Sequence, residues 1–297
     1  MSLTMKRIIM LLLGCCGACM VWPCLLTIQY FQPVFPGYLS FSLTQGIMLG
    51  LVFGAIFGSF EGIVVSSRTK AIKGLLFGAV AGVLSGAIGV FAGQAFLFGV
   101  ADSLQRTEQS LTGIPLILAN SMGWVIIGLC ISLIEGFRSR SLRKLLVGLA
   151  GGIVGGSLGG MLLQLSVIRY PGNQTALLVG LVVFGFFLSF FYSFFENRFS
   201  YGSIKLLNGP LRGKEYHLLK SRIRIGTRDT CDIVLPGYRN VTPLHASIQI
   251  KKGRVVLRPA GKSCPVTVND SPTQEAPLRR EDVFAIGSAK FMYGIFS

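Results

Sequence analysis

Residues 41–65 read FSLTQGIMLGLVFGAIFGSFEGIVV, an apolar stretch whose single charged side chain, Glu61, lies close to its end. A hydrocarbon core of about 30 Å is crossed by about 20 helical residues. The stretch is therefore long enough and apolar enough to predict a transmembrane helix.

Five further apolar runs of similar length occur before residue 198. Charged residues make up only 13% of the 297 residues, against about 25% in an average soluble domain. They are unevenly placed, because residues 1–198 hold 17 of them and the shorter remainder holds 23. We therefore expect a six-helix transmembrane domain over residues 1–198 and a soluble domain over residues 199–297. The other five expected spans are 8–29, 74–100, 115–136, 145–168 and 175–196.

The basic residues of the membrane half gather in alternate loops. Lysine and arginine beside transmembrane helices mark the cytoplasmic side, so these loops and both chain termini are predicted to be cytoplasmic. The net charge of +16 largely follows from this bias and from a basic tail beside anionic lipid, and it does not indicate a nucleic-acid partner. We expect a multi-pass protein of an inner or plasma membrane. The residues concerned are Lys6, Arg7, Arg68, Lys70, Lys73, Arg138, Arg140, Arg143 and Lys144.

The membrane half repeats itself at an offset of 74 residues. Glycines recur every fourth residue at 46–62 and at 74–86 and form a stripe along each of these expected helices; Ser132 replaces one of them in the second copy. In lipid, small residues let helix backbones approach and pack by van der Waals contact. We expect parallel hairpin repeats packed as glycine zippers, with a conduction path as the alternative. The matched positions are Gly54, Gly58, Glu61, Gly62, Gly74, Gly78, Gly82 and Gly86 with Gly128, Ser132, Glu135, Gly136, Gly148, Gly152, Gly156 and Gly160.

Three glutamates are the only candidates for chemistry in the membrane half. Glu61, Glu135 and Glu196 lie toward the ends of expected helices, and intramembrane carboxylates are costly and often line ion or proton routes. An arginine follows each of them closely, which places the three carboxylates near the cytoplasmic interface. We expect each carboxylate to pair with the basic loop after it, and an ion route is the alternative. The following arginines are Arg68, Arg138 and Arg198.

The seven cysteines are an odd number and indicate no disulfide framework. Cys16 and Cys19 have CxxC spacing, but they lie in an expected transmembrane helix without another ligand-type residue nearby. Helix packing is the expected role, and a redox or metal site is the alternative. The segment from Leu12 to Cys15 also resembles a lipoprotein cleavage box, whose use would remove the first segment. We predict no metal and no cofactor.

From Tyr201 onward the pattern changes to short β-rich runs separated by Gly, Pro, Asn and Asp. Many short strands with turn residues between them are typical of a sandwich. About 95 residues are enough to enclose one hydrophobic core. The expected strands are 204–207, 215–218, 222–225, 233–235, 246–251, 255–259, 266–268, 282–286 and 290–296.

Three motifs mark this tail. They are Ile225-Gly226-Thr227-Arg228 with Cys231-Asp232-Ile233-Val234-Leu235-Pro236, then Thr242-Pro243-Leu244-His245-Ala246, and then Val268-Asn269-Asp270. They are similar, in this order, to the first signature, the Ser-Arg-x-His-Ala motif and the Val-Asn-Gly turn of the forkhead-associated (FHA) domain family. The resemblance covers almost the whole tail and implies an all-β FHA-like sandwich after the helical membrane bundle.

The resemblance also implies a phosphothreonine site in the loops. An arginine of the family forks onto the phosphate, but here Thr227 stands at that place and Arg228 follows it. Cys264 stands where the family has an asparagine that holds the peptide, and a thiol is a weak donor. The tentative phosphopeptide-binding residues are Arg228, Thr242, Thr227, Lys262 and Asn269, and Gly226 and His245 are the implied structural residues, with His245 bracing the loop.

The leading hypothesis is a membrane-tethered interaction module for signalling or scaffolding. Its expected partners are the lipid bilayer and a cytoplasmic protein, a threonine-phosphorylated one included, with hetero- or homo-oligomers in the membrane as an option. A Walker-type loop and an HExxH pair are both missing, and His217 and His245 are the only histidines, so no enzyme is predicted. The alternatives are a transporter or channel regulated by the FHA-like domain, and a structural subunit of an envelope complex.

Overall fold

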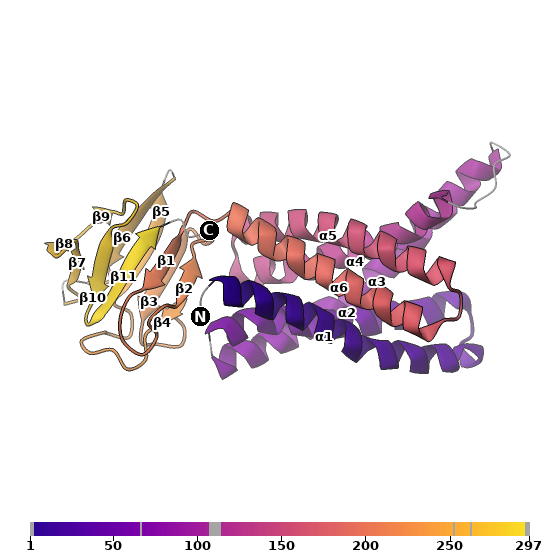
Figure 1. Cartoon of the computed structure of the whole chain (residues 1–297), viewed down its shortest axis with the longest axis horizontal. Helices are drawn as coiled ribbons and strands as arrows, with labels where there is room; N and C mark the ends of the chain where they lie inside the picture. The colour runs from indigo at the N-terminus through magenta and orange to yellow at the C-terminus, as the bar shows by residue number, and fades with distance from the viewer. Residues whose placement is uncertain (1–2, 66, 107–113, 252, 262, 295–297) are drawn as a thin grey trace.

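The computed structural model describes residues 3–65, 67–106, 114–251, 253–261 and 263–294 as six long helices followed by a β-sandwich (Figure 1). All six helices are long and apolar enough to cross a membrane, which confirms the expected helical bundle. A short 3-10 turn, η1, covers Gln32–Val34. The helices are α1 Leu3–Tyr30, α2 Tyr38–Val65, α3 Arg68–Arg106, α4 Ile114–Ser139, α5 Leu142–Arg169 and α6 Gln174–Arg198.

The last two helices begin at side chains that cap them. The Ser141 hydroxyl accepts a hydrogen bond from the Lys144 backbone N–H at 3.4 Å, so that α5 starts one residue later. The Asn173 side chain accepts bonds from the first backbone N–H groups of α6. Such caps satisfy donors that have no partner inside the helix. They fix where the short connections end and the spans begin.

Helices α2 and α3 approach each other until their backbones touch. Four glycines of α2 face four glycines of α3, and a Cβ atom added at any of these eight positions would collide with the opposite backbone. This antiparallel pair is held by contact between main chains. The repeat of 74 residues and the zipper remain predictions. The facing pairs are Gly46 with Gly86, Gly50 with Gly82, Gly54 with Gly78 and Gly58 with Gly74.

The tail folds as two packed sheets, which confirms the expected sandwich. Their strand orders are β2-β1-β11-β10-β7-β8 and β4-β3-β5-β6-β9. Strands β8 and β9 were not predicted, because they are short and contain proline. The strands are β1 Ser203–Leu206, β2 Glu215–His217, β3 Arg222–Gly226, β4 Ile233–Val234, β5 Ala246–Lys251, β6 Arg254–Pro259, β7 Val266–Val268, β8 Ser271–Thr273, β9 Ala276–Pro277, β10 Val283–Ile286 and β11 Ala289–Gly294.

Alternating side chains build the core between the sheets. In β3, Ile223 and Ile225 are buried while Arg222 and Arg224 are exposed, as the two-residue period of a strand requires. Phe284 and Phe291 are fully buried, and their stacked ring centroids lie 5.0 Å apart. The sandwich therefore has a hydrophobic core of its own.

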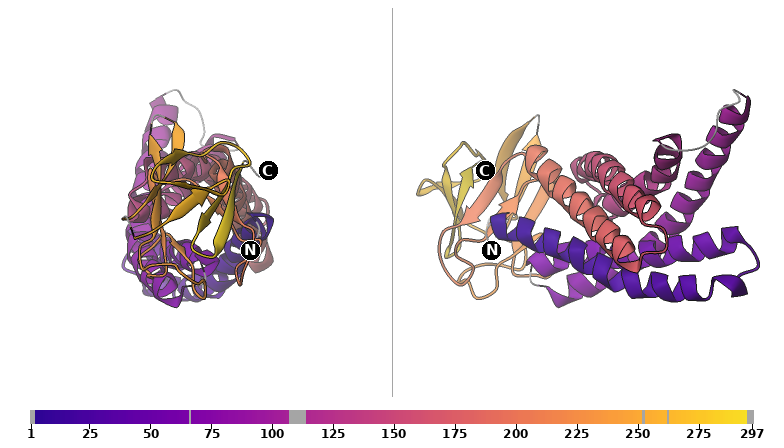
Figure 2. Two further views of the ribbon diagram at one scale, coloured as in Figure 1. Left: turned by 90° about the vertical axis from the view of Figure 1, so that its left-hand side faces the viewer. Right: turned by 45° about the vertical axis from the view of Figure 1, so that its right-hand side comes forward.

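The sandwich caps the end of the bundle at which the N-terminal helix begins (Figures 1 and 2). The Ser141 hydroxyl between α4 and α5 donates to the Leu219 carbonyl oxygen at 2.6 Å. The Arg143 guanidinium lies 3.2 Å from the ring centroid of Tyr201. The loop before α5, predicted to be cytoplasmic, thus contacts the tail directly.

Candidate functional site

Three loops lie together in the sandwich, and His245 connects two of them. The loops join β3 to β4, β4 to β5 and β6 to β7. The Thr242 backbone N–H donates to His245 Nδ1 at 3.2 Å, and His245 Nε2 lies 3.0 Å from the Pro265 carbonyl oxygen. Because Nδ1 accepts, Nε2 carries the proton and donates to Pro265. The buried imidazole therefore has two loop partners, and this geometry supports the bracing role implied by the family resemblance.

The first of these loops lies along the second. The backbone N–H groups of Thr227 and Arg228 donate to the carbonyl oxygens of Thr242 and Pro243, both at 3.1 Å. Gly226 sits so close to Pro243 that a Cβ atom would collide with its carbonyl oxygen. Only glycine fits there, and this close contact sets Thr227 and Arg228 beside Thr242.

The Arg228 side chain is exposed and available. Its guanidinium forms no hydrogen bond or ion pair with any residue in the described part of the chain. Thr227 beside it is also exposed. A guanidinium in this state can present its planar fork of donors to a phosphate without first breaking a protein contact.

The donors deeper in the loops are already engaged. The Thr242 hydroxyl donates to the Leu244 carbonyl oxygen at 3.0 Å and lies 3.4 Å from the Cys264 sulfur. Cys264 itself is buried, at 6% exposure. A hydroxyl has one hydrogen, so Thr242 must rotate away from Leu244 before it can donate to a ligand.

Two other residues of the tentative set stand apart. Asn269, in the turn after β7, donates to Asp282 Oδ1 at 2.9 Å and accepts from the Val283 backbone N–H at 3.0 Å. Its amide is thus committed to β10, at the opposite end of β7 from Cys264. Lys262 lies outside the described residues.

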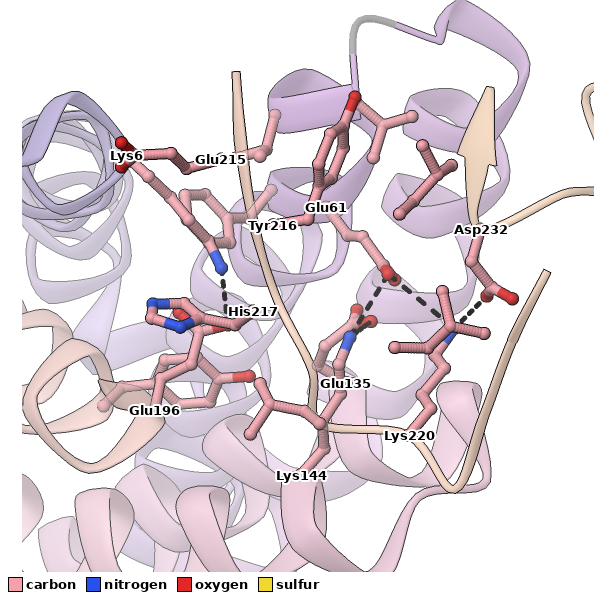
Figure 3. Close-up of a pocket in the computed structure, with 17 residues that line it drawn as sticks. Lys6, Glu61, Glu135, Lys144, Glu196, Glu215, Tyr216, His217, Lys220 and Asp232 are labelled. Atoms are coloured by element: carbon pink, nitrogen blue, oxygen red, sulfur yellow. Dashed lines mark hydrogen bonds and ion pairs between the residues drawn. The ribbon is translucent and has the colours of Figure 1, made fainter. Parts of the chain in front are cut away.

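A second group of polar side chains fills the interface between the bundle and the sandwich (Figure 3). Here α2, α4 and α5 meet the segment after β2, around a cavity of about 90 Å³. The Lys144 ammonium lies 3.2 Å from a Glu61 oxygen and 3.1 Å from a Glu135 oxygen. Glu135 and Lys144 are only 7% and 8% exposed. One cation therefore joins the carboxylates of Glu61 and Glu135.

Further charged side chains balance the charge of this group. The Arg138 guanidinium lies 3.2 Å from Glu61 and 3.7 Å from Glu135. The Lys220 ammonium lies 3.9 Å from Glu61 and 2.8 Å from Asp232, which belongs to the sandwich. We call the six residues the interface charge cluster; its three carboxylates and three cations are Glu61, Glu135, Asp232, Arg138, Lys144 and Lys220.

The expected partners of two glutamates were wrong. Glu61 pairs with cations of α4, α5 and the sandwich instead of Arg68. Glu196 pairs with Lys6 of α1 at 2.5 Å instead of Arg198. Sequence proximity favoured the following loop, but the helix packing brings other cations to the inward face. For Glu135 the expected neighbour Arg138 is present, with Lys144 closer.

His217 of β2 lies beside the Lys6 and Glu196 pair (Figure 3). Burial lowers the pKa of His217 to about 4; Lys6 and Arg7 act in the same direction, while Glu196 and Glu215 oppose it. The ring is therefore neutral at physiological pH. Its buried Nδ1 has no hydrogen-bond partner among the described residues. Nothing in the sequence around His217 predicts this burial, because Lys6 and Glu196 reach it only through the fold.

One helix of the bundle also contacts a candidate phosphopeptide loop directly. The Lys70 ammonium of α3 donates to the Cys231 carbonyl oxygen at 2.5 Å. The Cys231 backbone N–H in turn donates to the Arg228 carbonyl oxygen at 2.9 Å. Lys70 and Lys220 were not among the predicted site residues, because only the fold brings them to this loop.

The tail is an FHA-like domain, attached to six helices that are long and apolar enough to span a membrane. A family model described as the inner membrane component of T3SS, cytoplasmic domain (Yop-YscD), matches residues 205–294. The expected FHA resemblance is thereby confirmed for the tail. No match was found among curated protein sequences.

Three solved structures that resemble this chain each cover about a third of it. The FHA domain of FhaA, solved with the intracellular domain of another protein, is 25% identical over 31% of this chain and 97% of its own (TM-score 0.28). A domain from a study of phosphothreonine-dependent FHA interactions is 24% identical. The match covers 32% of this chain and 96% of that domain, with a TM-score of 0.29. The cytoplasmic domain of the T3SS sorting platform protein PscD from P. aeruginosa is 18% identical. The match covers 31% of this chain and 77% of that domain, with a TM-score of 0.28.

Proposed function

We propose that this chain tethers a non-catalytic interaction module to the cytoplasmic face of a membrane, where the module binds a threonine-phosphorylated segment of a cytoplasmic protein. The observation that supports this most is the exposed Arg228 guanidinium, which has no protein partner in the described chain and lies beside Thr227 and Thr242. Phosphate brings a charge of about −2 and three acceptor oxygens, which such a fork can bind.

The hydrogen bonds that the loop donors already make determine the expected affinity for a phosphopeptide. Rotating the Thr242 hydroxyl toward phosphate breaks its bond to Leu244, which costs about as much as one hydrogen bond, about 1 kcal/mol. The Cys264 thiol adds little because it is a weak donor. We expect binding that depends on Arg228 and is weaker than that of a site with an asparagine at position 264.

The test is calorimetric titration of the full chain in detergent with threonine-phosphorylated peptide libraries and their unphosphorylated counterparts. The phosphorylated pools should bind, and Arg228→Ala should weaken binding about 10- to 100-fold, since bonds to charged groups contribute about 1.5–3 kcal/mol. Arg222→Ala, an exposed arginine of β3, is the matched control. Equal affinity for both kinds of peptide would refute the proposal.

A gain-of-function variant tests the same site from the other side. Cys264→Asn replaces a thiol by an amide of similar size that offers two good donors. We expect about fivefold tighter binding to the phosphorylated pool, the equivalent of one added hydrogen bond. Ser263→Asn, the exposed neighbour, should leave the affinity unchanged. Unchanged affinity in Cys264→Asn would argue against a peptide at this loop.

The docking of the sandwich favours one second candidate, a structural subunit of an envelope complex. Contacts such as Ser141 to Leu219 hold the tail on the bundle as one body, as a spacer would require. Co-purification in mild detergent, with and without residues 200–297, separates the two functions. Cytoplasmic partners lost with the tail support recruitment, whereas membrane partners that persist without it support the structural role.

A further inference from the structure

A larger cavity lies in the bundle at the end away from the sandwich. It has a volume of about 370 Å³ and is lined by residues of all six helices. Pockets that hold small molecules are commonly about 300–1,000 Å³ and often lie between the helices of a bundle. The cavity is therefore large enough for a ligand.

Four glutamines from four different helices converge on this cavity. Gln29 belongs to α1, Gln45 to α2, Gln94 to α3 and Gln164 to α5, and Ser42 lies among them. The described residues of its lining include no charged side chain. An amide offers both donors and acceptors but no charge, so the lining suits an uncharged partner.

Two of the half-buried amides lack protein partners in the described chain, and so does the exposed Gln29. Gln94 Nε2 donates to the Ser42 hydroxyl oxygen at 2.6 Å. The side chains of Gln45 and Gln164 are half-buried, yet in the described chain they form no hydrogen bond with another residue. Both side chains line the cavity, so their amide groups are available to bind a molecule that enters it.

An aromatic ring forms part of the wall. Trp124 of α4 lines the cavity, and its ring packs edge-to-face on Phe184, with centroids 5.4 Å apart. Phe184 is fully buried, which fixes the position of the indole. A fixed aromatic surface beside neutral amides combines apolar contact with hydrogen bonding and suits a small molecule that has both kinds of surface.

We propose that this cavity is a binding site for a small uncharged molecule that carries amide or hydroxyl groups. Gln45 and Gln164 bind its polar groups, and Trp124 packs against its body. The four glutamines lie far apart along the chain and converge only when the helices pack.

Trp124 provides a built-in reporter. The chain has two tryptophans, so Trp22→Phe leaves Trp124 as the only indole in the full chain, reconstituted in nanodiscs. Acrylamide, a neutral amide, should quench its fluorescence with a saturable static component, and iodide at the same concentration should quench it far less. The double variant Gln45→Leu/Gln164→Leu should weaken the acrylamide association about tenfold, and Gln174→Leu, outside the lining, should not.

Two outcomes would overturn the proposal. Equal quenching by iodide would mean an open aqueous vestibule, and purely collisional acrylamide quenching that the double variant does not change would mean no binding. Thermal unfolding supplies a separate readout. Leucine at both positions should leave the melting temperature equal or raised, because unpaired amides are removed. A clear fall in the melting temperature would identify Gln45 and Gln164 as structural residues and would also overturn the proposal.

Discussion

Lys144 is the cation on which the interface charge cluster most depends, and Lys144→Met should destabilise the bundle. Its ammonium lies 3.2 Å from Glu61 and 3.1 Å from Glu135. At an effective dielectric constant of about 20, each such contact contributes about 5 kcal/mol before desolvation. Burial of the ammonium offsets much of this, and removing one partner of a buried pair typically costs about 3–5 kcal/mol. We expect a loss of that size.

The assay is reversible unfolding in mixed micelles with increasing SDS, followed by far-UV circular dichroism. Lys73→Met is the matched control, because Lys73 is exposed on the first turns of α3, and it should change stability by no more than about 0.5 kcal/mol. Adding Glu135→Gln to Lys144→Met should recover part of the loss, since one of the two stranded carboxylates becomes neutral. Wild-type stability in Lys144→Met, or no recovery in the double variant, would refute the reasoning.

Two further predictions concern packing and pH. Gly50→Ala should destabilise the full chain by about 1–3 kcal/mol in the same assay, because the added Cβ atom would collide with the Gly82 carbonyl oxygen. The control Gly99→Ala should have little effect, because there is open space around Gly99. Similar losses of stability in both variants would contradict the packing argument. His217 has a pKa of about 4 when docked and about 6.5 when free, so the docked state loses stability as the pH falls from 6.5 toward 4, by about 2 kcal/mol at pH 5. Hydrogen exchange of the β2 amides, corrected for intrinsic rates, should show lower protection at pH 5 than at pH 7 in the wild type but not in His217→Leu. If protection depends equally on pH in both proteins, His217 is not the cause of the pH dependence.

The helices and the sandwich were predictable because their signals are local. An apolar run such as residues 41–65 predicts a membrane span by its length and composition. The motifs around Gly226 and His245 place the loops of the FHA-like fold, and the structure shows why: Gly226 permits the contact with Pro243, and His245 bonds two loops.

The interface was not predictable, because its partners are distant in sequence. Glu61 pairs with Lys144 and Lys220, which follow it by 83 and 159 residues. The expectation that each carboxylate pairs with the arginine that follows it in the sequence was therefore wrong for Glu61 and Glu196. Likewise, Asn269 matches a family motif, but its amide is bound to β10, and only the three-dimensional contacts show this.

The contact between α2 and α3 has a consequence for how the sandwich is attached. Because the two backbones touch along four glycine pairs, α2 and α3 form one closely packed unit. Glu61 at the end of α2 reaches Lys220, and Lys70 at the start of α3 reaches the Cys231 carbonyl oxygen. The sandwich is therefore attached to both members of one helix pair, and one of the two attachments lies on the loop of Arg228.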